Sequence, residues 1–218
     1  MTTMKKYLDI VKHYEDCLEK YGDSHLGVDW PKAEDVDKRY QVMLDLIYTH
    51  EEEFNNRSLL DLGCGAAHLL EYIKKKKIEN ITYSGLDISP KFVALSHEKF
   101  PAQKFYHLDV LESSAILPSF DYIVINGAFT EKREMSFDEM FDYLKSMLRV
   151  VFSKSNKGIA FNLMTKHVDW ERDDLFHVPF DRIATFITKE LSRNFIIRND
   201  YGLYEYTVYV YKQPTING

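Results

Sequence analysis

The stretch Leu59–Leu70, LLDLGCGAAHLL, decides the fold because it joins a buried strand to a helix through a glycine turn. The apolar run ends in Asp61, and Gly63 and Gly65 follow one residue apart. Glycines at such a point let the backbone turn tightly and approach a ligand closely. A dinucleotide loop needs a third small residue where this chain has His68. The stretch therefore predicts a nucleotide-type site that holds no pyrophosphate.

The composition is that of a folded protein with one domain. The chain has 218 residues, is 45% hydrophobic and carries a net charge of −6. No apolar run is long enough to span a bilayer and the first twenty residues lack a signal-peptide core, so we expect a cytoplasmic protein. The negative charge argues against a nucleic-acid surface. Cys17 and Cys64 are expected to stay reduced.

Strands and helices alternate from residue 57 onward. This pattern predicts an α/β fold: a Rossmann-like, doubly wound, seven-stranded sheet, mostly parallel, with helices on both faces. No helix separates the last two strands, so they form an antiparallel C-terminal hairpin. Residues 57–218 are the predicted core, and residues 1–56 are a helical cover with helical patterns over 4–21 and 33–53. The predicted strands are 58–62, 81–87, 104–110, 120–127, 157–165, 194–200 and 203–212, and the predicted helices are 68–77, 89–100, 136–152 and 180–191.

Polar residues follow successive strands where ligands of open parallel sheets bind, beyond the carboxyl ends. Asp87 ends the second strand, 22 residues after Gly65, near the spacing at which an acid meets ribose hydroxyls. Asp109 ends the third strand and Asn126 the fourth. Two acids at neighbouring strand ends disfavour phosphate, because like charges repel. They suit a ribose and an adenine amino group.

These motifs, in this order, resemble those of the class I S-adenosylmethionine-dependent methyltransferases. The matching segments are DLGCGAA (61–67), GLDIS (85–89), LDV (108–110) and FDYIVING (120–127). GVDWP (27–31) with Arg39, and LYEYTVYVYK (203–212), are similar to a bacterial subgroup that methylates small molecules. The resemblance implies S-adenosyl-L-methionine as cofactor and S-adenosyl-L-homocysteine as product.

The resemblance also implies roles for individual residues at the cofactor. Gly63 and Gly65, with Cys64 between them, would contact the methionine portion, and Asp61 would order the turn. Asp87 would accept both ribose hydroxyls. The other implied cofactor contacts are Ile88 packing on adenine, Asp109 accepting from the adenine amino group, Val110 beside it, Asn126 after the fourth strand, and Arg39 pairing with the methionine carboxylate. Asp61 and Asp109 could instead cap strand ends, and Arg39 could be a surface residue of an amphipathic helix.

Catalytic and acceptor-binding residues are expected after the fourth and fifth strands and in the N-terminal cover. His167 is the candidate general base, since a histidine pKa suits proton transfer near neutral pH; the alternative is a surface loop histidine. The candidate acceptor contacts are Tyr14, Trp30, Phe129 and His177, each of which could instead be a packing residue. Glu131 is expected to face solvent. The acidic loop 169–174 is expected to be solvated, so we predict no metal.

The leading hypothesis is a methyltransferase that acts on a polar small molecule at oxygen. No Asn-Pro-Pro-aromatic motif of amino-group methylation follows the fourth strand. One alternative is a cofactor-binding partner subunit without catalysis, and a second is a nicotinamide-dependent oxidoreductase. The predicted partner is a small-molecule substrate, with no nucleic acid and no membrane. The acceptor and the oligomeric state do not follow from the sequence.

Overall fold

The computed structural model describes residues 5–51 and 55–215. The ends of the predicted helical patterns, at residue 4 and at residues 52 and 53, lie outside this range, as do residues 216–218 of the predicted core. The helices are α1 (Tyr7–Tyr21), α2 (Ala33–His50), α3 (His68–Lys75), α4 (Pro90–Lys99), α5 (Val110–Ser113), α6 (Phe137–Lys154) and α7 (Phe180–Glu190), with a 3-10 turn at Ser114–Ile116. The strands are β1 (Arg57–Leu62), β2 (Ile81–Asp87), β3 (Lys104–His107), β4 (Phe120–Ile125), β5 (Ser155–Met164), β6 (Phe195–Arg198) and β7 (Glu205–Tyr211).

The strands form one seven-stranded sheet in the order β3-β2-β1-β4-β5-β7-β6. β7 is antiparallel to β5 and to β6, while the other pairings are parallel. The predicted doubly wound sheet with its C-terminal hairpin is confirmed, and the reversed strand lies one position inside the edge. The strand order reverses between β1 and β4, so a crevice opens beyond their carboxyl ends.

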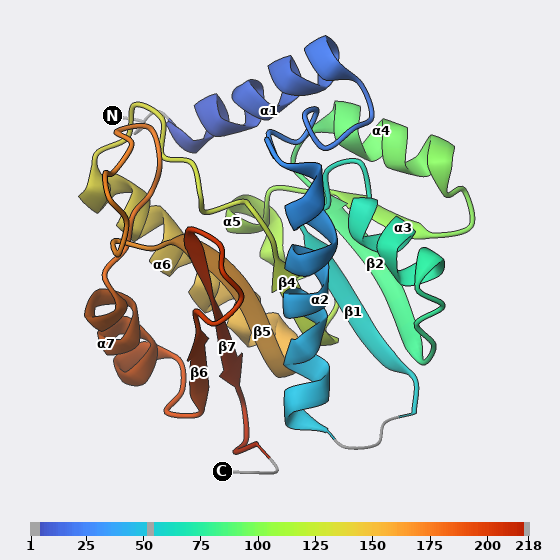
Figure 1. Ribbon diagram of the computed structural model, residues 1–218. Helices are drawn as coiled ribbons and strands as arrows, with labels where there is room; N and C mark the ends of the chain where they lie inside the picture. Colours follow the sequence, from blue (N-terminus) through green and yellow to red (C-terminus); the bar gives the residue numbers. More distant parts are fainter. Residues whose placement is uncertain (1–4, 52–54, 216–218) are drawn as a thin grey trace.

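Two apolar layers cover the sheet because neighbouring residues of each strand point to opposite faces. Leu59 packs with the layer under α2, α3 and α4, and Leu60 with the layer under α5, α6 and α7. In Figure 1, α2 passes in front of the sheet and α6 behind it. Both leucines are fully buried. This burial on both faces is what an apolar strand in a parallel sheet requires.

Local capping sets where the helices begin. Ser136 and Glu139 form a capping box at the start of α6, and Ser89 accepts from the Phe92 backbone N–H at the start of α4. The predicted strand over 104–110 is too long, since β3 ends at His107. The reason is Asp109, whose carboxylate accepts from the Leu111 backbone N–H and begins α5.

The two N-terminal helices have different surroundings. α2 belongs to the core, because Tyr209 and Tyr211 of β7 donate hydrogen bonds to its Val42 and Leu46 carbonyls. α1 lies across the end of the molecule where the parallel strands finish (Figure 1). Within residues 5–51 and 55–215, no helix is both long and apolar enough to cross a membrane.

Candidate functional site

A cavity with about 1100 Å³ of empty space, its mouth included, lies at the carboxyl ends of the strands and beneath α1. Its walls come from the first three strand ends, from the loop after β4 and from α1. The predicted site residues that line it are Tyr14, Trp30, Asp61, Gly63, Cys64, Gly65, Asp87, Ile88, Asp109, Val110 and Asn126. Three carboxylates line the cavity and no lysine or arginine of the described chain does.

The glycine turn forms the floor of the cavity. Gly63 and Gly65 have φ angles of 75° and 51°, in the left-handed region where a side chain is strained. A Cβ on Gly65 would stand 3.4 Å from the Val28 side chain. The Gly65 N–H donates to Asp87 Oδ2 at 2.9 Å, so the turn is tied to the end of β2. Both glycines are needed for the backbone to reach the cavity.

Asp61 and Asp87 are carboxylates held in a nearly dry setting. Asp61 is 3% exposed and accepts from the Tyr83 hydroxyl at 2.8 Å. Burial raises the pKa of Asp61 to about 7, despite that hydrogen bond. Burial also raises the pKa of Asp87, although backbone N–H groups of Ser89 and Gly65 stabilise its charge. A carboxylate has about four lone-pair sites, so Asp87 retains capacity for hydroxyl donors of a ligand.

Asp109 has a structural role and also stands in the cavity wall. It caps α5 and also lines the cavity, where the Tyr7 hydroxyl donates to its Oδ2 at 2.7 Å. The Tyr7 ring stacks on Tyr143, with centroids 4.9 Å apart. Sequence reasoning missed Tyr7 and Tyr143 as cavity residues. The signal was present in α1, where Tyr7, Ile10, Val11 and Tyr14 share one face and all line the cavity.

The loop after β4 forms the opposite end of the cavity. The Tyr14 hydroxyl donates to the Gly127 carbonyl at 3.2 Å, and the Trp30 indole lies against Gly127. Both polar atoms of the Asn126 side chain are buried without a hydrogen-bond partner among residues 5–51 and 55–215. A buried amide without partners is costly and is expected to serve a ligand.

His68 explains how the turn differs from a dinucleotide loop. It is the first residue of α3, lines the cavity, and its Nε2 lies 2.7 Å from Asp23 Oδ1 in the loop after α1. His68 thus stands in the first turn of α3, the end of the helix at which a dinucleotide loop would place a pyrophosphate. Its contact with Asp23 also ties the covering loop to α3.

Arg39 and Phe129 lie outside the cavity lining. The Arg39 guanidinium pairs with both oxygens of buried Glu205 on β7, at 3.0–3.2 Å, and stacks over Trp30 at 5.0 Å. Phe129 is 1% exposed and packs edge-on against Tyr143 and Phe161 in the core. Arg39 therefore reaches the cavity wall through Trp30, on which its guanidinium stacks.

The two candidate histidines after β5 also lie outside the cavity lining. The His167 ring packs against Phe180, with centroids 5.1 Å apart. His177 is buried, its Nδ1 donates to the Thr165 carbonyl at 2.6 Å, and its Nε2 accepts from the Arg172 backbone N–H. His177 therefore holds the ends of its own loop together.

The acidic loop 169–174 and the single residue Glu131 lie in different surroundings. In the loop 169–174, Glu171 pairs with Lys166 and Asp174 pairs with Arg172. The expectation that Glu131 faces solvent is wrong, since Glu131 is 5% exposed. Its backbone bridges to Leu175, which folds the loop after β5 over it.

Comparisons with known proteins agree with this arrangement. The family model described as a methyltransferase domain matches residues 60–151. A protein of Mycobacterium tuberculosis described as a methyltransferase, Rv1506c, is 29% identical over 157 residues, which are 71% of this chain and 93% of that protein.

Solved structures show the same fold at low identity. Magnesium protoporphyrin IX methyltransferase from Synechocystis PCC 6803, with bound S-adenosylmethionine, has a TM-score of 0.64 at 14% identity. The match covers 98% of this chain and all of that one. The plantazolicin methyltransferase BpumL, in complex with a pentazolic analogue and S-adenosylhomocysteine, has a TM-score of 0.61 at 15% identity and covers 96% and 99% of the two chains.

The family match, the curated relative and the strand-end motifs around one cavity lead to the same conclusion. The nicotinamide-dependent alternative is disfavoured, because no lysine or arginine of the described residues lines the cavity to bind a pyrophosphate and the first residue of α3 is His68. The chain is an S-adenosylmethionine-dependent methyltransferase, with a methyltransferase domain matched over residues 60–151.

Proposed function

We propose that this methyltransferase transfers the methyl group to an oxygen atom of a polar small molecule. The observation that carries the proposal is the position of α1, which covers the cavity and places Tyr7 and Tyr14 in its wall. An acceptor must fit beneath this helix together with the cofactor. The space of about 1100 Å³, its open mouth included, suits a cofactor and a small acceptor, and a duplex or a folded protein is too bulky for it.

The cavity fits the cofactor by charge as well as by shape. S-adenosylmethionine supplies an electrophilic methyl group on a positively charged sulfur. Asp87 and Asp109 give the cavity negative charge, Asp61 adds to it above about pH 7, and no lysine or arginine of the described residues lines it. In the proposed arrangement Asp87 accepts from the ribose hydroxyls, and Asp109 accepts from the adenine amino group beside Tyr7. The glycine turn leaves room for the methionine portion.

The acceptor is proposed to lie between Trp30, Tyr14 and Asn126. The unpaired Asn126 amide can donate to an acceptor oxygen or accept from its hydroxyl. Burial raises the pKa of Tyr14, so its hydroxyl stays neutral and is no base near neutral pH. This end of the lining therefore favours an oxygen that is already ionised, such as a carboxylate, which needs no proton removed.

The names of the structural neighbours are compatible with small acceptors. One is named for magnesium protoporphyrin IX and the other for plantazolicin. His167 stands outside the lining, so we expect His167→Ala to keep wild-type turnover. A large loss of turnover in His167→Ala would instead support the general base predicted from the sequence.

The test is methyl transfer from labelled S-adenosylmethionine to a panel of carboxylated, hydroxylated and amino small molecules. We expect transfer to oxygen, and alkaline hydrolysis of the product separates a methyl ester from a methyl ether. Asp87→Ala should weaken S-adenosylhomocysteine binding by about 1.5–3 kcal/mol, the cost of losing hydrogen bonds to a charged group. Asp181→Ala, on the exposed first turn of α7, is the matched control. Transfer to amines alone would refute the oxygen assignment.

A further inference from the structure

We propose that His13, Cys17 and Asp29 form a zinc site that fastens α1 over the cavity. Within residues 5–51 and 55–215, these three side chains bring one ligand atom each to within 4.8 Å of one another. None of them lines the cavity. The site is thus separate from the cofactor and acceptor groups.

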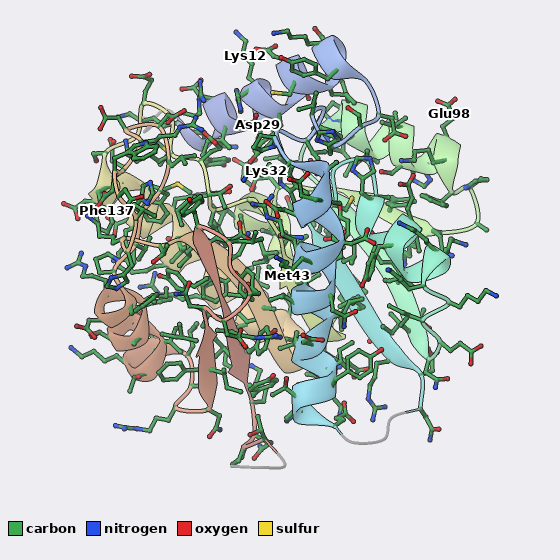
Figure 2. All side chains as sticks on the ribbon, viewed as in Figure 1. Lys12, Asp29, Lys32, Met43, Glu98 and Phe137 are labelled. Carbon is green, nitrogen blue, oxygen red and sulfur yellow. The ribbon has the colours of Figure 1, made fainter. Side chains whose placement is uncertain are left out.

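The spacing of the donor atoms suits a tetrahedral ion. His13 and Cys17 stand one turn apart on the same face of α1, and Cys17 Sγ lies 3.8 Å from His13 Nε2. His13 Nε2 lies 2.8 Å from Asp29 Oδ2, and Figure 2 places Asp29 beside α1. Zinc bonds of about 2.0–2.3 Å at tetrahedral angles separate ligand atoms by roughly 3.3–3.8 Å. Small side-chain shifts bring the three atoms to those separations.

The donor set selects the kind of metal. One imidazole nitrogen, one thiol sulfur and one carboxylate oxygen are the ligands that zinc uses, whereas magnesium and calcium prefer oxygen alone. Cys17 is a free, buried cysteine, so its sulfur is available to a metal and not committed to a disulfide. His13 is partly exposed and Asp29 is 39% exposed at its side chain, which leaves an entry path.

Glu131 supplies a second, independent feature of the site. Its carboxylate is buried, yet its one side-chain partner among the described residues is Arg133 at 3.4 Å. It lies close enough to Asp29, His13 and Cys17 for their charges to act on one another. Two carboxylates near a thiol form a negative cluster that a divalent cation would neutralise. Water can complete the four ligands, because Glu131 is outside the group whose ligand atoms lie within 4.8 Å of one another.

The ion would join the two walls of the cavity that come from the N-terminal segment. Tyr14 follows His13 on α1, and Asp29 lies between Val28 and Trp30; all three neighbours line the cavity. α1 is already held to the core by hydrogen bonds from Tyr7 to Asp109 and from Tyr14 to Gly127, and by exposed ion pairs such as Lys6–Glu139 and Lys91–Glu19, whose members are 43–62% exposed. Exposed pairs of this kind contribute little. A bound zinc ion is therefore expected to slow the release of cofactor.

The first experiment measures the metal itself on the full chain after treatment with a chelator. Titration with Zn²⁺ should give one ion per chain. Titration with Co²⁺ should give a sulfur-to-cobalt charge-transfer band, because Cys17 is a ligand. Cys17→Ser should lose the band and Cys64→Ser should keep it, since these are the chain's two cysteines. An unchanged band in Cys17→Ser, or no Zn²⁺ binding at all, would overturn the proposal.

The second experiment measures how Zn²⁺ binding at α1 affects the release of S-adenosylhomocysteine from the cavity. Zn²⁺ should slow S-adenosylhomocysteine dissociation in the wild type, and His13→Gln or Asp29→Asn should remove that difference and weaken Zn²⁺ binding roughly tenfold or more. His97→Gln, an exposed histidine on α4, is the matched control. Equal dissociation rates with and without Zn²⁺ would refute the fastening role. Thermal unfolding in chelator checks that the variants fold, and S-adenosylhomocysteine binding in chelator tests the methyltransferase site separately.

Discussion

The Asn126 side chain, which directly follows β4, is expected to destabilise the ligand-free fold. Both polar atoms of its side chain are buried without a partner. An unsatisfied buried amide destabilises a protein by roughly 1–3 kcal/mol. Since the side chain lines the cavity, a ligand is the natural source of the missing hydrogen bonds. Stability and function should therefore respond in opposite directions when this amide is removed.

Asn126→Leu tests these opposite effects, because leucine has the same number and branching of side-chain heavy atoms and no polar atoms. We expect the free energy of unfolding without ligand to rise by about 1 kcal/mol in urea denaturation. Methyl transfer should fall at least about tenfold, the equivalent of one lost hydrogen bond of that size. A variant that is destabilised and fully active would show that the amide has no ligand role.

Asp61 should make stability depend on pH near neutrality. Burial raises its folded-state pKa to about 7, well above the 3.8 that is ordinary for an aspartate. The unfolded chain therefore loses this proton first, and the stability due to protonated Asp61 is lost as pH rises through 7. Between pH 5 and pH 8 the loss is about 2–3 kcal/mol.

Asp61→Asn is the matched variant, since it keeps an oxygen for the Tyr83 hydroxyl and cannot ionise. Urea unfolding of both proteins without ligand should show that the wild type loses more stability than the variant from pH 5 to pH 8. Parallel pH dependence in the two proteins would mean that Asp61 ionises normally in the folded state.

At the scale of elements, α2 and β7 are joined by a buried ion pair. Arg39 and Glu205 are 15% and 3% exposed at their side chains. Removing one partner of such a pair leaves the other charge uncompensated and costs about 3–5 kcal/mol. The same contact holds Trp30, over which the guanidinium stacks. Arg39 therefore helps to position Trp30, which lines the cavity.

Arg39→Met should lower the free energy of unfolding by about 3–5 kcal/mol, and Arg39→Met with Glu205→Gln should recover most of it. Urea denaturation of the four proteins in a double-mutant cycle measures this. If Arg39→Met keeps its stability and loses cofactor affinity instead, the carboxylate-binding role implied by the resemblance is the correct one.

At the scale of the whole molecule, ligand binding should stabilise the fold through the cavity where three strand ends, the β4 loop and α1 meet. S-adenosylhomocysteine at one hundred times its Kd adds about 2.7 kcal/mol. For a chain of this size, that raises the Tm by roughly 5–10 °C. NADH should give no comparable shift, because the cavity lining contains no lysine or arginine. A thermal-shift assay with both ligands checks this, and stabilisation by NADH alone would contradict the assignment.

Most of the fold could be predicted because its signals are local. Strands and helices follow from short apolar patterns, and Ser89 and Ser136 mark helix starts within three residues. The strand-end residues Asp61, Asp87 and Asp109 line the cavity as expected, since parallel strands end at one edge. The end of β3 was missed because Asp109 also caps a short helix, and the strand pattern hides that role.

The acceptor end could not be predicted in the same way. His167 and His177 follow β5 as a catalytic histidine would, yet neither lines the cavity. The loop that carries them is folded onto Glu131 and Phe180 by long-range contacts. The N-terminal helix α1 has no family motif at all, although one of its faces lines the cavity.

The sequence by itself determined the order of the elements, the glycine turn and the three acids at the strand ends, because capping, periodicity and turn geometry act over a few residues. Only the tertiary structure decided which distant side chains meet: Tyr7 with Asp109, Arg39 with Glu205, and Tyr14 with Gly127. These pairs are separated by more than one hundred residues, and their contacts depend on how α1 and α2 pack on the finished sheet. The strand-end residues of the proposed cofactor site thus follow from local sequence patterns. The position of α1 and the acceptor end of the cavity depend on long-range packing.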